Sequence, residues 1–428
     1  MTSWPGRLNL FQATMLEWRD FHPYNAVHAA RIDSPLDAAA LRAAVHAELA
    51  QSGLTGLALD RNRCRYAWRG GAAHADIETI DAGSDWEGTL ACTFERHLNA
   101  PFPREGALDP FRFFAMRVGD AFFLGIAYDH FIAGGDSIIG LLDAIAARYA
   151  GKAPAASRLR LYPHTHARLF ARHPLRFARG LARLPALARS CRRTIRPRYR
   201  NLEDGHNGFM FCWLTATQYG ALRKRAKAWG VTLNDALMAL LLDAQNAAMP
   251  ARDGSKRRHE LAVASIINLR GAHGEDARTF GQFLGSFRIS HPVPPGATLE
   301  MLARDVHAAT TRIKREKLFL TTLFAMAVDR VIGKLQTRAH RMAIYAKNYP
   351  VGAGVSSLNV DALWRSGSSG APLYVRGVPT GPLSPIVAAV TTSGPRMCIG
   401  ISYRTTALSP TEAIALRNDL VTRIDQLQ

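Results

Sequence analysis

A strongly basic segment without a single acidic residue divides this chain of 428 residues into two halves. Between Ala144 and Leu202 the sequence contains 15 lysines and arginines and no aspartate or glutamate, against a formal net charge of +20 for the whole chain. Prolines interrupt the segment, among them Pro163, Pro174, Pro185 and Pro197. Because proline breaks the interior of a helix, one continuous helix is excluded. We therefore expect a connector of short pieces between two separately patterned halves.

Between the prolines of this connector, leucine and phenylalanine alternate with arginine on a helical period, as in LRFARGLARL. The pattern predicts short amphipathic helices. Such helices suit an anionic membrane surface or an acidic protein partner. A solvated inter-domain linker is the structural alternative. No nucleic acid partner is expected, because aromatic stacking platforms and known nucleic-acid motifs are missing.

The composition of the chain is that of a globular protein. Hydrophobic residues make up 48% and charged residues 21%, which excludes a disordered or coiled-coil chain. The five cysteines are scattered without a CxxC pair, so neither a disulfide framework nor a metal site is expected. The sequence has no signal-peptide pattern and no apolar run of roughly 18 residues. We expect a cytoplasmic protein.

Helices and strands alternate in both halves. In the first half, residues 111–118 and 121–128 predict a β-hairpin, and an amphipathic helix follows it. In the second half, the stretch ELAVASIINLRG predicts a buried strand that ends in Asn268, Leu269 and Arg270. The expected fold class is therefore α+β. The expected domains are residues 1–155, a basic connector at 156–204, and residues 205–428.

His130 stands where an apolar strand gives way to a Gly-Gly loop in front of a helix. Rigid scaffolds commonly present catalytic groups at such edges, and an unperturbed pKa of roughly 6.5 suits a general base. A buried core histidine is the structural alternative. Gly134 and Gly135, followed by Asp136, could hold an anion at the helix N-terminus. The glycines match neither the P-loop nor the dinucleotide-binding fingerprint.

The segment from Leu98 to Ala150 resembles the core of nonribosomal peptide synthetase condensation domains. Their superfamily also contains chloramphenicol acetyltransferase, plant-type alcohol acyltransferases and bacterial wax ester synthases. Its hallmark is a strand that ends in HHxxxDG, preceded by a "PF…G.P.R" segment. The residues that match the preceding segment are Pro101, Phe102, Gly106, Pro110 and Arg112. His130 falls on the second, catalytic histidine of the hallmark.

The resemblance continues through both halves. Phe11-Gln12 and Met15-Leu16 resemble the opening helix, and Thr232 to Asp235 resembles the start of a helix in the second half. Three further stretches resemble the family's "NLR…fGN" and "vSN" segments: Asn268-Leu269-Arg270, Phe280-Gly281-Gln282, with glutamine in place of the asparagine, and Val355-Ser356-Ser357.

The resemblance implies a fold and an activity. The fold is two chloramphenicol-acetyltransferase-like α/β sandwich subdomains that form a V around a central tunnel containing His130. The activity is transfer of an acyl group from a thioester, linked to phosphopantetheine on a carrier protein or to CoA, to a hydroxyl or an amine. His130 would accept the proton of the acceptor. Amides near Gly134 and Gly135, with the hydroxyl of Ser356 or Ser357, would stabilise the oxyanion. No metal or redox cofactor is implied.

Two positions depart from the hallmark motif. Asp129 replaces the first histidine, and Gly134 stands at the position of the aspartate. In the family that carboxylate pairs with an arginine and holds the loop in place. Asp136, two residues later, could take over this role, and Arg270 is the candidate partner. Alternatively, the loss marks a degenerate site, and the chain is a condensation-like docking module without chemistry.

The expected partners follow from these alternatives. An acyltransferase would use an acidic acyl carrier protein or acyl-CoA, with a small-molecule or lipid acceptor, in natural-product or specialised-lipid biosynthesis. The connector also resembles a segment of the wax ester synthases. In this alternative, the chain is a lipid acyltransferase in peripheral contact with the anionic inner membrane surface.

Overall fold

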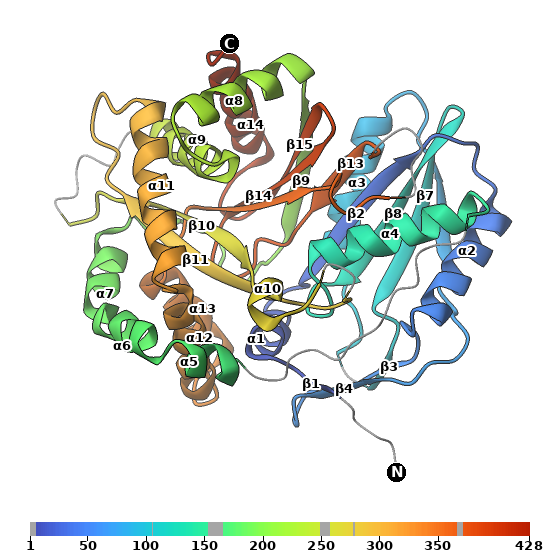
Figure 1. Ribbon diagram of the computed structural model, residues 1–428, viewed down its shortest axis with the longest axis horizontal. Helices are drawn as coiled ribbons and strands as arrows, with labels where there is room; N and C mark the ends of the chain where they lie inside the picture. Colours follow the sequence, from blue (N-terminus) through green and yellow to red (C-terminus); the bar gives the residue numbers. More distant parts are fainter. Residues whose placement is uncertain (1–5, 105, 153–165, 249–256, 277–278, 366–370) are drawn as a thin grey trace.

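The computed structural model describes residues 6–104, 106–152, 166–248, 257–276, 279–365 and 371–428. These residues form two lobes that lie side by side, each built from helices packed on a β-sheet (Figure 1). The α+β fold class predicted from the sequence is confirmed. Among the described helices, none combines the length and the apolar character needed to cross a bilayer.

The first lobe is organised around a five-stranded sheet. Its order is β13 (Tyr374–Gly377), β2 (Asn25–Ile32), β8 (Ala121–Asp129), β7 (Phe111–Val118) and β5 (Ile77–Asp81). Helices α2 (Ala38–Gln51) and α4 (Gly135–Tyr149) cover one face, and α3 (Trp86–Asn99) covers the other. The predicted hairpin is β7–β8, paired from Phe111↔Tyr128 to Val118↔Ala121. Because β8 is buried along its whole length, the residue that follows it is fixed in position.

A small sheet and one helix stand at the start of the first lobe. The sheet has the order β1 (Gly6–Arg7), β4 (Arg65–Trp68), β3 (Leu57–Asp60) and β6 (Gly106–Leu108). Helix α1 (Leu10–Trp18) begins with a capping box, in which Asn9 and Gln12 exchange side-chain and backbone hydrogen bonds.

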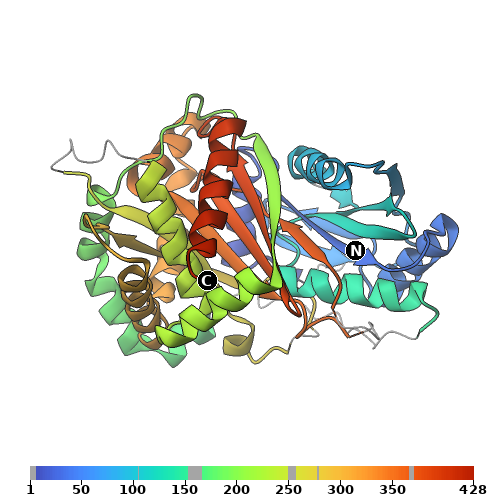
Figure 2. The same ribbon diagram turned by 90° about the horizontal axis from the view of Figure 1, so that it is seen from above.

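The second lobe is organised around a six-stranded sheet. Its order is β11 (Leu284–His291), β10 (Leu261–Asn268), β12 (Ala353–Asn359), β14 (Ile386–Ser393), β15 (Arg396–Arg404) and β9 (Asn207–Leu214). The helices that share its main core are α8 (Ala216–Ala228), α9 (Leu233–Ala248), α11 (Leu299–Arg315) and α14 (Pro410–Asp425). Figure 2 shows α14 lying across the strands of this sheet. Three further helices are α10 (Arg270–His273), α12 (Phe319–Gly333) and α13 (Arg338–Asn348).

One strand joins the two lobes. Strand β13 belongs by position to the predicted unit 205–428, yet it pairs antiparallel with β2 of the first lobe, from Tyr374↔Ala30 to Gly377↔Val27. The second unit is therefore not self-contained. Local pattern predicts that a buried strand exists but not which sheet it joins, because pairing partners are far apart in the sequence.

The described part of the basic connector is folded onto the second lobe. It forms three short helices, α5 (Ala167–Arg172), α6 (Pro174–Ala182) and α7 (Leu184–Arg193), as the proline spacing predicts. Pro174 and Pro185 stand in the first turns of α6 and α7, where a missing N–H costs no helical hydrogen bond. A Cβ atom on Gly180 would lie 2.2 Å from the Thr321 hydroxyl of α12, so α6 packs closely there. Residues 166–194 are thus not a solvated linker; Pro163 lies outside the described residues.

The fold buries an unusual set of histidines. Desolvation lowers the pKa of these histidines below the usual value of 6.5. The pKa falls to about 4 for His22, His97, His130 and His166. It also lies well below 6.5 for His28. Folding therefore places these rings in the neutral form.

We expect mild acid to destabilise the protein. Between about pH 6.5 and pH 4 the unfolded chain binds protons at these histidines and the folded chain does not, so stability rises with pH. Each of the four histidines with a pKa of about 4 lowers the free energy of unfolding by about 2 kcal/mol between pH 7 and pH 5. The raised pKa of Asp129, about 6, acts in the opposite direction but is one group against five. Urea titrations at both pH values should show a drop of several kcal/mol; an equal free energy of unfolding would contradict the burial of neutral histidines.

Candidate active site

His130 directly follows β8, and α4 begins five residues later at Gly135. Its backbone N–H donates to the Tyr24 carbonyl at 3.1 Å, which holds the turn. Its ring stacks on Tyr24, with centroids 5.8 Å apart, and meets the edge of Tyr128 at 5.7 Å. The side chain is 8% exposed. Two aromatic neighbours and a buried strand therefore fix the orientation of the imidazole.

The imidazole lines a cavity between the two lobes. The cavity has a volume of about 210 Å³, and both lobes contribute to its wall. The polar residues along the wall include His130, Asp136, Asn234, Ser265, Asn268, Ser356, Ser357 and Arg376. The Nδ1 atom of His130 is buried, which leaves Nε2 as the ring nitrogen that can reach the cavity.

Burial and charge keep His130 neutral. Desolvation lowers its pKa to about 4, the nearby Arg376 guanidinium lowers it further, and the backbone of Ala133 acts in the opposite direction. At neutral pH the ring therefore carries a free lone pair, which a general base requires.

The loop after His130 is held by an ion pair across the two lobes. The Arg270 Nε atom lies 3.0 Å from Asp136 Oδ2, and the two side chains are 6% and 12% exposed. Asn268 donates to the same carboxylate oxygen at 3.1 Å. Arg270 also donates through Nη2 to the Ser137 hydroxyl at 3.1 Å. The two residues considered as partners from the sequence are therefore in direct contact, and Asp136 supplies the carboxylate that the motif position lacks.

The structure explains why position 134 is glycine. A Cβ atom there would lie 2.9 Å from Asp136 Oδ1, so a side chain at 134 would compete with Asp136 for the same space. The Gly134 N–H donates to the Gly281 carbonyl at 3.0 Å. Of the amides expected near Gly134 and Gly135, the Gly134 N–H is therefore already bonded and supports the loop. Gly135 is the first residue of α4, so its N–H has no acceptor within the helix.

Gln282, which replaces the asparagine of the family pattern, ties the histidine loop to the second lobe. Its Nε2 donates to the carbonyl of His130 at 2.8 Å and to that of Ala133 at 3.1 Å. Gln12 of α1 donates to the next carbonyl, that of Phe131, at 3.1 Å. These side chains satisfy carbonyls of an irregular buried segment, which would otherwise be costly to bury.

Ser356 and Ser357 of β12 both line the cavity, but their hydroxyl groups form different hydrogen bonds. The Ser356 hydroxyl oxygen accepts from Arg376 Nη1 at 3.0 Å, so its own proton remains available to a ligand. The Ser357 hydroxyl donates to Asn234 Oδ1 at 3.1 Å, so its proton is already used. Of the two candidates, Ser356 is therefore the better oxyanion donor.

Arg376 is a site residue that the sequence analysis missed. It is 2% exposed, and its guanidinium bonds to oxygens of Ser356 and Val390. The described residues provide no carboxylate ion-paired with it. Burial lowers its pKa to about 10, so it stays charged at neutral pH. The one available signal was an arginine inside the buried strand YVRG.

Asp129, which replaces the first histidine of the motif, has a structural partner. Its carboxylate forms an ion pair with Arg19 of the first lobe, and both side chains are buried. Burial raises the pKa of Asp129 to about 6, although Arg19 acts in the opposite direction. The Arg19–Asp129 pair therefore lies at the beginning of the histidine loop, and the Arg270–Asp136 pair lies at its end. Among the described residues, no three His, Cys, Asp or Glu side chains are grouped to hold a metal ion.

Comparison with known proteins identifies the fold. No protein-family model matches the sequence, and no curated protein matches it. The first condensation domain of the CDA synthetase superposes with a TM-score of 0.69 at 17% identity, covering 100% of this chain and 96% of that one. A mutant starter condensation domain of rhizomide synthetase in complex with C8-CoA gives 0.68 at 14% identity, covering 99% and 94%. The X-domain from teicoplanin biosynthesis gives 0.63 at 18% identity, covering 100% and 96%. The chain therefore has the condensation-domain fold over its whole length.

We expect the Asp136→Asn substitution to destabilise the protein by about 3–5 kcal/mol, because it leaves the Arg270 charge buried without a counter-charge. Asp33→Asn is the matched control, since the Asp33 side chain is 80% exposed in its pair with Arg31. Urea unfolding monitored by circular dichroism provides the comparison. Equal effects of the two substitutions would show that the Arg270–Asp136 contact does not hold the loop.

Proposed function

We propose that this chain is an acyltransferase that moves an acyl group from a carrier-protein or CoA thioester to a hydroxyl or amine acceptor, with His130 as general base. The observation that carries the proposal is the position of His130. A neutral imidazole with one free ring nitrogen lines a cavity to which both lobes contribute. The condensation-domain fold supports the reaction class.

The proposed reaction assigns a role to each group. Nε2 of His130 takes the proton of the acceptor while the acceptor heteroatom attacks the thioester carbonyl. The resulting oxyanion receives a hydrogen bond from the Ser356 hydroxyl, whose oxygen is polarised by Arg376. Collapse of the tetrahedral intermediate breaks the C–S bond, and the thiolate takes the proton back from His130. Atoms and charge balance without a redox cofactor.

The charge of the protein supports an anionic donor. The net charge is +20, and many connector arginines are exposed on the described part of the surface. Acyl carrier proteins are acidic and CoA carries phosphates, so opposite charge would accelerate the encounter with either. One neighbour of the same fold was crystallised with C8-CoA, which favours a CoA thioester as one arm of any substrate panel.

We expect His130→Ala to lower acyl turnover by roughly a hundredfold or more, because it removes the general base. Medium-chain and aromatic thioesters, on carrier protein and on CoA, would be offered to a panel of alcohols and amines, with products detected by mass spectrometry. His340→Ala, on an exposed position of α13, is the matched control. Equal product from wild type and His130→Ala would remove His130 from the mechanism. Absence of product with the whole panel would favour the docking-module alternative.

A second candidate is acyl transfer at a membrane surface, and an exposed apolar strip on α12 favours it. The strip consists of Phe324, Val328, Val331 and Ile332 of α12 and of Leu335 just after the helix. Ile332 and Leu335 are 49% and 89% exposed. Leu175 of the adjoining α6 is 74% exposed, and Phe177 contacts Phe324 with ring centroids 5.6 Å apart. Arg176 is an exposed neighbour of Leu175. Apolar and basic side chains on one surface suit an anionic bilayer.

If the protein works at a membrane surface, it should float with anionic vesicles in a density gradient and not with neutral vesicles. Val331→Asp should reduce the bound fraction several-fold, because it places a negative charge where the strip would meet the lipid. Ile414→Asp is the matched control, since Ile414 is exposed on α14 and is not part of the strip. Absence of binding to anionic vesicles would exclude the membrane-surface alternative.

A further inference from the structure

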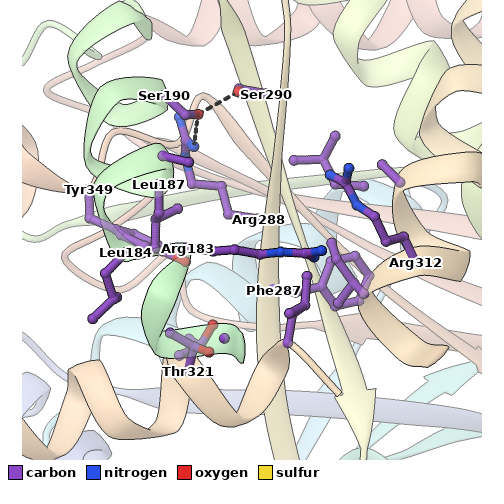
Figure 3. Close-up of a pocket in the computed structure, with 17 residues that line it drawn as sticks. Arg183, Leu184, Leu187, Ser190, Phe287, Arg288, Ser290, Arg312, Thr321 and Tyr349 are labelled. Atoms are coloured by element: carbon purple, nitrogen blue, oxygen red, sulfur yellow. Dashed lines mark hydrogen bonds between the residues drawn. The ribbon is translucent and has the colours of Figure 1, made fainter. Parts of the chain in front are cut away.

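A second cavity lies beneath the connector, outside the site of His130. Its volume is about 470 Å³, within the range of pockets for small molecules. The wall is formed by α6 and α7 on one side and by β11, α11 and α12 on the other (Figure 3). We name this cavity the connector pocket.

The interior of the connector pocket is mainly apolar. Its apolar side chains are Leu184, Ala186, Leu187, Phe287, Ile289, Ala309, Ile313 and Leu318. No aspartate or glutamate is among the residues that line it. A hydrocarbon chain would bury apolar surface here without desolvating a carboxylate.

Two guanidinium groups reach toward the pocket from opposite sides. Figure 3 shows Arg183, from the junction of α6 and α7, and Arg312, from α11, directed toward each other across it. Arg183 forms an ion pair with Glu316, whereas Arg312 has no ion pair within the described residues. Arginine pairs are well suited to bind a carboxylate or a phosphate.

The wall also contains one buried hydroxyl without a hydrogen-bond partner and several polar groups that are bonded to one another. The Thr321 hydroxyl is buried without a hydrogen-bond partner in the described structure, and the residue is 7% exposed. Arg288 is buried against hydroxyl and carbonyl oxygens, including the Ser190 hydroxyl at 3.0 Å from its Nη1. The Ser190 and Ser290 hydroxyls are 2.7 Å apart (Figure 3). A buried hydroxyl without a partner is costly to the fold.

We propose that the connector pocket binds a single-chain amphiphile with an anionic head group. The hydrocarbon chain lies along the apolar wall of α7, α11 and β11, and the carboxylate or phosphate lies between Arg183 and Arg312. Phe287 and Tyr349 line both this pocket and the cavity of His130, so the two cavities share a wall. The ligand site is independent of the acyl transfer proposed above, because it uses no residue of the proposed reaction.

The test compares head groups of opposite charge on one chain length. Isothermal titration below the micelle concentration would use dodecanoate and dodecyl phosphate as the two anionic probes, with dodecanol and dodecyltrimethylammonium as controls. We expect the anionic probes to bind at least tenfold more tightly than either control. A difference between dodecanoate and dodecyl phosphate would identify which anionic head group is preferred. Equal affinity for dodecanol and both anions would overturn the proposal.

Matched variants locate the binding. Arg312→Gln should weaken the binding of dodecanoate by roughly tenfold, the effect of one charged hydrogen-bonding partner. Lys314→Gln, on the same helix but outside the pocket wall, makes the same change in net charge and should leave the affinity unchanged. Equal effects of the two variants would reduce the interaction to overall charge and overturn the proposal.

A third variant closes the pocket. Leu187→Trp fills it from α7 and should abolish binding, whereas Ile414→Trp, on the surface of α14, should not. Circular dichroism would verify that Leu187→Trp is folded. If Leu187→Trp does not fold, the Arg312→Gln variant still tests the proposal. His130→Ala should retain full affinity for dodecanoate, so failure of acyl transfer and failure of this proposal can be told apart. Retained binding in a folded Leu187→Trp would contradict the pocket as the site.

Discussion

The ion pair between Asp136 and Arg270 is the contact on which the central cavity depends. It joins the first turn of α4 in one lobe to the first residue of α10 in the other, and both charges are almost fully buried. A buried ion pair of this kind adds little net stability, but breaking it is costly because one charge remains without a partner. Its consequence is geometric. The loop that carries His130 has one position relative to the second lobe, and the cavity has walls from both.

The rest of the site is arranged around that fixed loop. Gln282 and Gln12 satisfy the loop carbonyls, and the Arg19–Asp129 pair holds the beginning of the loop. The same close packing removes water from the imidazole and lowers its pKa to about 4. A base with a lowered pKa is weaker for each proton transfer, but it is almost entirely in the reactive neutral form at neutral pH. Arg376 has two roles in this site. Its charge disfavours an imidazolium at His130, and its Nη1 atom donates a hydrogen bond to Ser356.

Sequence reasoning predicted the local elements and the position of the histidine. The β7–β8 hairpin, the short connector helices and the Asp136–Arg270 contact follow from strand alternation, proline spacing and the displaced motif carboxylate. The pairing of β13 with the first sheet could not be predicted, since strand pairing is decided by contacts between residues far apart in the sequence. Arg376 and the connector pocket were missed for the same reason: their surroundings come from segments brought together only by folding. The sequence left open whether Gly134 supports the loop or an oxyanion, because the acceptor of its amide, Gly281, is far away in the sequence.

The pH dependence of kcat/KM for acyl transfer to an alcohol tests the central claim most directly, within the range where circular dichroism shows the protein folded. An alcohol does not titrate near neutrality, so the acidic limb reports the free-enzyme base. With His130 buried and its pKa lowered to about 4, kcat/KM should stay constant from pH 8 down to the acid limit of folding. A decline to half its maximum near pH 6.5 would instead indicate a solvated histidine and would contradict the cavity described above.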